Sequence, residues 1–380
     1  MRMTRFRLSL ASLMVACVWV ACPASAQGPP KIDEFAAGGM LPRHVEQMKA
    51  SVGYWVKSIQ DANEDITVIK ARTGLLAEYA NMTARQAGYT YAQQVSAIAR
   101  PMLVKGLEKD PLRQVKEVNL AIAMAGMPQV TIQPALDAMV SHPTNAAVRY
   151  FGWKGYHAAR TRLLAQGLPS AQKMFKSVDS AARTETVPQV LGELYRVLEL
   201  ELRPGAVLAD TWALAQRRSL QAIQPNWRPW CKRLRDGDEG MCEALQKAAR
   251  AIRKNADWIA QDKQQKKMAL QMLVDLAFHA AKAYIAARAA GETGEALKDL
   301  LLECEKALNA VKRADKRFIG KTLTDPRAAA QPQAVLLWVD PSTKENYGVL
   351  AWVDFLKGDG VVPPQDFENK PTKAPATKPA

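Results

Sequence analysis

The feature that most constrains the fold is a helical spacing of apolar residues that continues through most of the chain. From Leu41 to Arg317, apolar side chains recur at three- and four-residue intervals in segments rich in Ala, Leu, Gln, Arg and Lys. Pro, Gly, Asn or Asp interrupts this spacing about every 12 to 25 residues, which is the usual length of helices in globular proteins. The sequence therefore predicts an all-α chain.

The segment DPLRQVKEVNLAIAMAGM, residues 110–127, illustrates one such unit. Asp110 is suited to cap the N-terminus of a helix, and Pro111 fits the first helical position, where its missing N–H costs no hydrogen bond. The apolar stripe that follows contains Leu112, Val115, Val118, Ala121 and Ile122. Because this stripe is wide, we expect the helix to pack against partners on more than one side.

Similar units follow, each beginning near a Pro and carrying a Val a few residues later. Val115, Val148 and Val190 are separated by 33 and 42 residues. Paired helices that recur at about 30 to 45 residues are typical of an α-solenoid, in which each pair must stack on its neighbours to bury its apolar face. The sequence predicts a right-handed α-solenoid of stacked helical hairpins over residues 41–320.

Two segments resemble known helical repeats. Residues 110–200 are similar to HEAT or armadillo repeats, with NAAVRYFGW at 145–153 in the place of their first helix. The later segment around Gly291 and Glu295-Ala296-Leu297 is similar to a tetratricopeptide repeat, although Lys306-Ala307-Leu308 comes about four residues later than that pattern requires. The repeat class stays open, and either resemblance implies a protein that presents a binding surface and carries no catalytic residues or cofactor.

The N-terminus has the features of an export signal. Arginines at positions 2, 5 and 7 precede an apolar segment from Leu8 to Val20, and Ala24-Ser25-Ala26 provides the small side chains of a cleavage site. We expect residues 1–26 to be removed, leaving a flexible linker at 27–40 and a periplasmic or secreted product. A lipoprotein anchored at Cys22 is the alternative, although the indole of Trp19 fits such a signal poorly.

The pattern changes after Thr324. The hexapeptide VLLWVD at 335–340 returns as VLAWVD at 349–354, and turn-forming residues connect the two copies. These features predict a capping element over residues 321–360, either a small β-hairpin or a final helix beginning after Pro341. Residues 361–380 are rich in Pro and Lys, which predicts a flexible, cationic tail.

Few residues of the chain suggest chemistry. With the signal removed, three cysteines remain, and the turn-rich loop between Cys231 and Cys242 predicts a disulfide between these two. The four histidines are far apart in the sequence and we expect no metal site and no cofactor. Ser170 and Lys173 have the S-x-x-K spacing of some exported acyl-transfer enzymes, but the accompanying K-T-G motif does not occur, so we expect no such nucleophile.

Charge gives the best indication of partners. The formal net charge is +15, and removal of the signal would leave about +12, which favours anionic partners. Because no nucleic-acid-binding motif occurs, we expect an envelope protein or an anionic glycan or lipid surface instead of nucleic acid. Residues at helical spacing on one segment are candidate contacts: Arg149, Trp153, His157 and Arg160.

These observations predict an exported, non-enzymatic binding or scaffold protein. The alternative is an exported α/α-toroid glycan hydrolase or lyase, because the catalytic carboxylates of such enzymes come from distant helices and leave no local motif. The modest aromatic content of 7% argues against a carbohydrate cleft of the usual aromatic kind.

Overall fold

A computed structural model describes residues 28–33, 40–107, 109–201 and 203–364. About 75% of this part of the chain is helical and almost none of it is strand, which confirms the all-α prediction. No helix within it combines the length and the apolar character needed to cross a membrane. The predicted signal peptide, half of the predicted linker and most of the C-terminal tail lie outside the described residues.

The elements follow one another with short connections. The longer helices are α1 (Pro42–Asp61), α2 (Asp65–Asn81), α3 (Arg85–Pro101), α4 (Arg113–Ala125), α5 (Gln133–Val140), α6 (Ala146–Ala165), α7 (Leu168–Thr184), α8 (Pro188–Val197), α9 (Ala209–Ile223), α10 (Trp227–Arg235), α11 (Met241–Lys254), α13 (Lys263–Ala289), α14 (Glu295–Lys312) and α17 (Val349–Leu356). The shorter elements are α12 (Ala256–Ile259), α15 (Phe318–Thr324), α16 (Pro326–Ala329), β1 (Trp338–Val339), β2 (Asn346–Tyr347), a π-helical turn η1 (Met102–Gly106), and the 3-10 turns η2 (Val130–Ile132), η3 (Gln224–Asn226), η4 (Pro332–Val335) and η5 (Lys357–Asp359).

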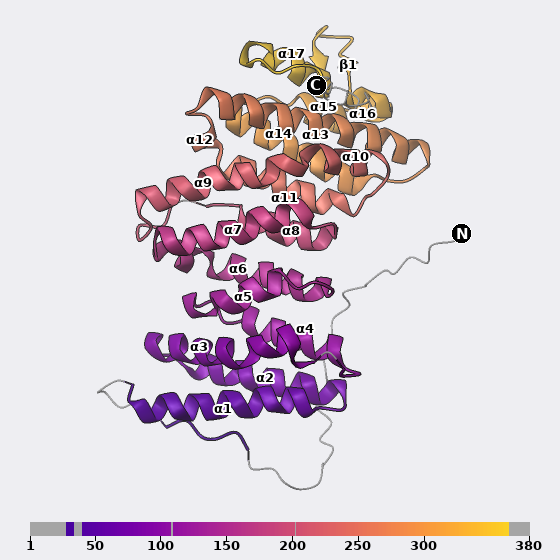
Figure 1. The fold of residues 1–380 in the computed structure, drawn as a ribbon. Helices are drawn as coiled ribbons and strands as arrows, with labels where there is room; N and C mark the ends of the chain where they lie inside the picture. The colour runs from indigo at the N-terminus through magenta and orange to yellow at the C-terminus, as the bar shows by residue number, and fades with distance from the viewer. Residues whose placement is uncertain (1–27, 34–39, 108, 202, 365–380) are drawn as a thin grey trace, which may run out of the picture.

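The longer helices form two rows that run the length of the molecule, and from α1 to α9 successive helices alternate between these rows (Figure 1). In the first row, α2, α4, α6, α8, α11 and α14 each pack on the next. In the second row, α1, α3, α5, α7 and α9 do the same, and α10 packs on α13. Helices α1 and α17 lie at opposite ends of this stack (Figure 1). A helix with a neighbour on either side in its own row and a partner in the other row must bury a wide apolar stripe.

Helix α4 shows how this packing modifies the expected pattern. It begins at Arg113, because Asp110 instead accepts the N–H of Leu112 at 2.8 Å in the preceding turn. Lys116 is buried on the face of α4 next to α1, where its Nζ donates to the carbonyl oxygen of Gln60 at 2.7 Å. The residues buried between rows thus include charged groups that find partners, which an apolar pattern alone does not reveal.

Two glycines of α6 allow a close approach to its neighbours. A Cβ atom at Gly155 would lie 2.6 Å from Cδ2 of Leu136 on α5 and 3.1 Å from Cα of Ala125 at the end of α4. A Cβ atom at Gly152 would lie 2.9 Å from Cβ of Met139 on α5. The helix backbones therefore pack without an intervening side chain at this level of the stack.

Polar side chains join successive helices of the first row. The joined pairs are Arg72 with Asn119 at 2.9 Å, Asn145 with Glu117 at 2.9 Å, Lys247 with Glu193 at 2.9 Å, and Arg253 with Glu303 at 2.7 Å. The glutamates of these pairs are almost fully buried. A buried carboxylate is costly unless it is paired, so each pair favours one position of a helix relative to the next.

The C-terminal element contains both structures that the sequence suggested. β1 pairs with β2 in an antiparallel hairpin, but β2 precedes the second hexapeptide, which forms helix α17. Val349, Trp352, Val353 and Leu356 are all buried, and their spacing is helical. Gly348, with φ of +95°, makes the change from strand to helix in a conformation that other residues rarely adopt.

Buried Glu305 of α14 attaches this C-terminal element to the stack. Its carboxylate accepts the backbone N–H groups of Ile319 and Gly320 at 2.7 and 2.8 Å, at the start of α15. The indole N–H of Trp352 on α17 donates to the same carboxylate at 3.3 Å. One side chain therefore fixes both α15 and α17 on α14.

The first prediction concerns the close approach at α6. Replacement Gly155→Ala should lower the free energy of unfolding by about 1 to 3 kcal/mol, because the new methyl group meets the backbone of α4. The matched control is Gly53→Ala on α1, where a Cβ atom meets nothing within 4 Å. That change should raise the free energy of unfolding by about 0.5 to 1 kcal/mol through helix propensity. Urea denaturation measures both, and equal effects at the two sites would contradict the packing described for α6.

The second prediction concerns Asp275, a buried carboxylate on α13 whose pKa is raised to about 6 by burial. In the unfolded chain this group ionises near pH 4, so the folded state retains a proton that the unfolded state has lost between about pH 4 and 6. Stability should therefore fall as pH rises through this window. Asp275→Asn should flatten that dependence and raise the free energy of unfolding at pH 7 by about 1 to 3 kcal/mol.

Urea denaturation as a function of pH tests this expectation. Asp257→Asn is the control, because the side chain of Asp257 is 98% exposed and its replacement should change stability by less than about 0.5 kcal/mol. A pH dependence between 4 and 6 that is the same with and without Asp275 would contradict it.

Candidate functional site: a cationic groove between α5 and α7

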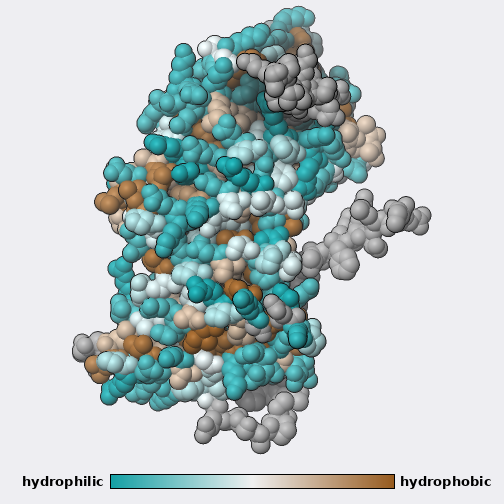
Figure 2. All heavy atoms as spheres, in the orientation of Figure 1, coloured by the Kyte–Doolittle hydropathy of each residue, from teal (hydrophilic) through white to brown (hydrophobic). Residues whose placement is uncertain are grey.

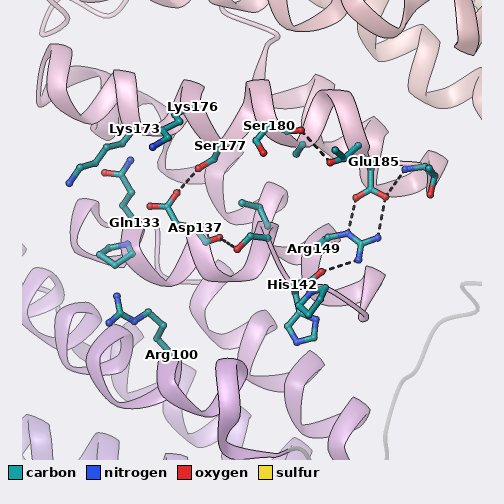
Figure 3. A pocket seen from close by; sticks show the side chains of 17 residues that line it. Arg100, Gln133, Asp137, His142, Arg149, Lys173, Lys176, Ser177, Ser180 and Glu185 are labelled. Atoms are coloured by element: carbon teal, nitrogen blue, oxygen red, sulfur yellow. Dashed lines mark hydrogen bonds and ion pairs between the residues drawn. The ribbon is translucent and has the colours of Figure 1, made fainter.

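A groove of about 970 Å³ opens between α5 and α7 in the second row of helices (Figure 3). Its walls come from the end of α3, from α5 and the loop after it, from the start of α6, and from α7 and the loop that leads to α8. Elements from three consecutive helical pairs therefore contribute to one recess.

Three cationic side chains converge at one end of the groove. Arg100 comes from the last turn of α3, and Lys173 and Lys176 come from α7; all three are exposed. Figure 3 shows Arg100 and the two lysines on opposite sides of this end, with the amide of Gln133 between them. Among the described residues none of these cations has a hydrogen-bond or ion-pair partner. This end of the groove therefore carries net positive charge, with three cations near the single carboxylate of Asp137.

Local structure places these cations. Arg100 directly precedes Pro101, which ends α3 and leads into the π-helical turn η1. Proline cannot continue the hydrogen-bonding ladder, and π-helical turns often occur at functional sites. On α7, the polar residues of the groove follow at helical spacing, whereas the opposite face is buried. The groove-facing set is Lys173, Lys176, Ser177, Ser180 and Thr184.

The middle of the groove contains a carboxylate that joins three helices. Asp137 of α5 accepts the phenol O–H of Tyr156 on α6 and the hydroxyl of Ser177 on α7, the latter at 2.7 Å. Tyr156 is fully buried, and burial together with the neighbouring Asp137 raises its pKa. Both bonds end on Oδ1 of Asp137, so the other oxygen has no partner among the described residues.

An ion pair closes the far end. Arg149 at the start of α6 donates from Nε and Nη2 to the two oxygens of Glu185, at 2.8 and 3.1 Å. Glu185 is 5% exposed and also accepts the backbone N–H groups of Thr186 and Val187 at 3.1 and 3.0 Å. A bidentate pair of this kind fixes the loop between α7 and α8 against α6.

His142 lies beside this pair in the loop between α5 and α6. Its Nδ1 accepts the N–H of Asn145 at 3.1 Å, and its Nε2 lies 3.6 Å from a carboxylate oxygen of Glu117. Burial lowers the pKa of His142, with the guanidinium groups of Arg113 and Arg149 acting in the same direction. The imidazole is therefore neutral at neutral pH and adds no charge to the groove.

Only one of the four sequence-predicted contact residues reaches this groove. Arg149 lines it, as part of the ion pair above, whereas Trp153 is fully buried and lies 5.5 Å from the ring of Tyr156. Half-buried His157 has its pKa lowered to about 4, chiefly by burial. Of the four candidate contacts, Trp153 and Arg160 are buried in the stack, and Arg149 and His157 are half-buried.

Arg160, the fourth of them, has a structural role. It is 8% exposed, and its Nη1 donates to the carbonyl oxygens of Arg196, Val197 and Glu199 at 3.2, 3.0 and 2.9 Å. These carbonyls lie at and just after the C-terminal end of α8, where backbone acceptors lack partners within the helix and a cation is favourable. Arg160 thus fastens α6 to α8 and is not available to a ligand.

The expected disulfide between Cys231 and Cys242 is not formed. Both residues, and Cys304, are free and buried. Cys231 on α10 lies near Asp275 and Cys304, whereas Cys242 lies near the acidic turn that precedes α11, so the two thiols face different surroundings. Burial raises the pKa of Cys242 to about 12, which leaves an unreactive thiol at neutral pH. In the described part of the chain, no three His, Cys, Asp or Glu side chains are placed to hold a metal ion.

A second hollow, of about 560 Å³, lies on the C-terminal element between α15 and α17. Phe318, Tyr347 and Phe355 line it, and the ring of Phe318 contacts the rings of the other two at centroid distances of 6.4 and 5.8 Å. Trp352 is fully buried and Trp338 nearly so. The aromatic side chains near the C-terminus are thus mainly a packed cap.

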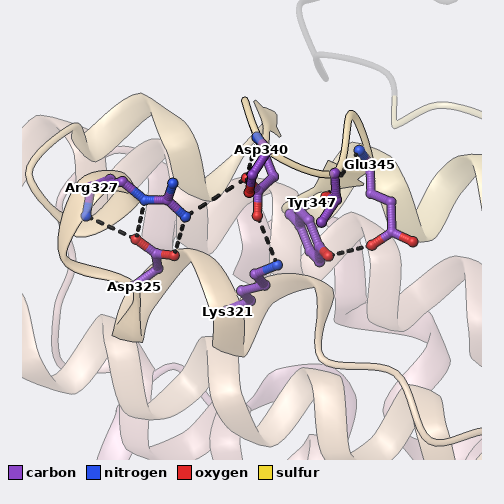
Figure 4. A network of polar contacts seen from close by, with 8 residues as sticks. Lys321, Asp325, Arg327, Asp340, Glu345 and Tyr347 are labelled. Carbon is purple, nitrogen blue, oxygen red and sulfur yellow. Dashed lines mark hydrogen bonds and ion pairs between the residues drawn. The ribbon is translucent and has the colours of Figure 1, made fainter.

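A polar network closes the hairpin beside this hollow (Figure 4). Asp340 accepts from Lys321 at 3.0 Å and from the hydroxyl and backbone N–H of Ser342, and Arg327 lies 3.7 Å away. These partners, the hydroxyl of Ser342 first, hold the pKa of Asp340 well below its usual range. Lys321 also lies 3.9 Å above the ring of Tyr347. The charges here pair with one another, in contrast to the three cations of the α5–α7 groove.

The chain matches no protein-family model, and no curated protein sequence is significantly similar to it. The interpretation of the α5–α7 groove therefore depends on its own geometry and charge. Sequence spacing could have indicated the polar face of α7, because its five groove residues recur at helical intervals. Nothing in the sequence could have placed Arg100 opposite Lys173.

The third prediction concerns the ion pair at the far end. Glu185→Gln should lower the free energy of unfolding by about 2 to 4 kcal/mol, because it leaves Arg149 partly buried without its counterion. Glu46→Gln on α1 is the control, since the ion pair of Glu46 with Lys49 is exposed and should contribute less than about 0.5 kcal/mol. Urea denaturation measures both. A small effect at Glu185, comparable to that at Glu46, would show that the loop before α8 does not depend on this pair.

Proposed function

We propose that this chain is an exported, non-enzymatic binding protein that holds another component of the cell envelope through the α5–α7 groove. The single observation that carries the proposal is the cluster of Arg100, Lys173 and Lys176 in a recess, without partners among the described residues. The three cations are exposed and come from two helices, so together they make this end of the groove attractive to an anionic ligand.

The packing supports a right-handed α-solenoid of the HEAT or armadillo kind as the architecture behind this function. From α1 to α7 each helix packs on the helix two positions further along the chain, which is the arrangement that stacked hairpins produce, and α8, α10 and α11 pack on the helix three positions further. Solenoids of this type act by presenting an extended surface. The recess between successive helices of one row is a natural place for such binding.

Export supports an envelope partner. The basic residues, apolar segment and small-residue tripeptide at the N-terminus fit a cleaved signal, and the lipoprotein alternative at Cys22 would place the same domain at a membrane surface. The face of the molecule in Figure 2 is mainly hydrophilic, with apolar areas that are small and separate. Recognition through charge and hydrogen bonds suits such a surface better than a broad apolar contact.

The alternative function, an α/α-toroid glycan hydrolase or lyase, has less support. In a toroid the first and last helices meet, whereas α1 and α17 lie at opposite ends here (Figure 1). The two carboxylates of the groove, Asp137 and Glu185, already accept hydrogen bonds from Tyr156 and Arg149 respectively. Each has a structural role that accounts for its position.

The fourth prediction tests the groove as the binding site. The mature chain should co-sediment with isolated cell-envelope fragments, and the double variant Lys173→Glu, Lys176→Glu should weaken this binding about tenfold or more, since it replaces two attractive contacts with repulsive ones. The matched control is Lys57→Glu, Lys70→Glu, which makes the same change in net charge at exposed sites on α1 and α2 outside the groove.

Equal binding by both double variants would contradict the proposal, because it would show that net charge and not the groove determines binding. Turnover of an envelope polysaccharide by the mature chain that is lost in Asp137→Asn would establish the enzymatic alternative.

A further inference from the structure

The α5–α7 groove has two chemically different halves that share the polar face of α7. One half contains the three cations and the amide of Gln133, the other contains hydroxyl groups and the Arg149–Glu185 ion pair, and Asp137 with its free oxygen lies between the two. In Figure 3, Asp137 and Ser177 lie between the cationic end and the Arg149–Glu185 ion pair. A ligand that fills the groove must therefore carry negative charge and also hydrogen-bond donors close to that charge.

The lining argues against several kinds of partner. It contains no aromatic side chain, and its apolar members are small or cyclic: Pro134, Val140, Pro143 and Ala181. Peptide recognition usually depends on a buried aromatic or large aliphatic anchor, and binding of single-stranded nucleic acid depends on aromatic stacking. A flat bilayer surface would reach the exposed cations at the rim of this recess but not half-buried Asp137 within it.

Asp137 discriminates between the two remaining kinds of polyanion, which are phosphate polymers and acidic sugars. Its free oxygen lies near the cations and can accept a hydrogen bond, but it repels any ligand that has acidic oxygens and no donors there. A polyphosphate has no donors of this kind at neutral pH. An acidic sugar has a carboxylate and several hydroxyl groups on the same ring, so it satisfies the cations and Asp137 together.

We infer that the groove binds an acidic polysaccharide, namely a linear glycan of uronic-acid type. This inference rests on the proposed function. Arg100, Lys173 and Lys176 hold its carboxylates from both sides of α5. The free oxygen of Asp137 and the hydroxyl of Ser180 bond to its ring hydroxyls. The chain runs across α5 along the polar face of α7, from the cations toward the Arg149–Glu185 pair.

Calorimetric titration of the mature protein with oligogalacturonate of defined length tests this inference. The fully methyl-esterified oligosaccharide, which keeps the hydroxyl groups and loses the charge, should bind about tenfold or more weakly. The variant Lys173→Glu, Lys176→Glu should lose affinity for oligogalacturonate to a similar extent. The control Lys57→Glu, Lys70→Glu should stay within about twofold of the unchanged protein, because these exposed sites are remote from the groove.

Two further variants test the sugar hydroxyl contacts. Ser180→Ala removes an exposed hydroxyl and should leave the fold unchanged. It should lower the affinity for oligogalacturonate by about three- to tenfold, which is the usual contribution of one hydrogen bond. Asp137→Asn should lower the affinity for oligogalacturonate and raise the affinity for inorganic polyphosphate. General destabilisation of the fold cannot produce such opposite changes. Circular dichroism checks that each variant is folded.

Other outcomes would overturn the inference. Tighter binding of polyphosphate than of oligogalacturonate by the unchanged protein would assign the groove to phosphate polymers, and groove-dependent binding to phosphatidylglycerol vesicles would assign it to lipid headgroups. Envelope binding that needs Lys173 and Lys176, combined with no affinity for oligogalacturonate, would overturn the glycan but leave the proposed function standing. Oligogalacturonate affinity that does not depend on the groove lysines would contradict both.

Discussion

The interaction on which the rest of the structure depends is the pairing of buried polar side chains between successive helices of the first row. Each of these helices is covered on more than one side, so any charge on its inner face must find a partner on a neighbouring segment. The pairs between Arg72 and Asn119, Lys247 and Glu193, and Arg253 and Glu303 recur along the row. Together with the close contact at Gly155, they fix the position of each helix relative to its neighbours, and therefore the width of the groove on the other row.

Sequence periodicity predicted the helical class and the main interruptions because both depend on local chemistry: proline ends a helix, and apolar spacing follows the helical repeat. It did not predict the orientation of α6, since the same four-residue spacing occurs on a buried face and on an exposed one. Trp153 and Arg160 face the interior because α6 has neighbours on both sides in its row. The cysteines show the same limit, because nearness in sequence between Cys231 and Cys242 says nothing about the direction of the two side chains. Arg100 and Lys173 are brought together only by stacking.

The contrast between paired and unpaired charges supports the groove as the functional part of the molecule. Asp137, Glu185 and Arg149 have partners that hold helices together, and the same is true of Asp340 at the C-terminal end. The cations at the mouth of the groove have no such role, and their removal would cost the fold little. Grouped in one recess, these cations create a local positive potential that attracts anions.

The pairs that join the first row connect residues only 28 to 54 positions apart in the sequence. Contacts of such short range form quickly, because little chain entropy is lost in bringing their ends together. A chain emerges from the ribosome N-terminus first. Each helical pair of this protein can then dock on the previous one as soon as it arrives, so folding can proceed in the order of emergence without waiting for the C-terminal segments.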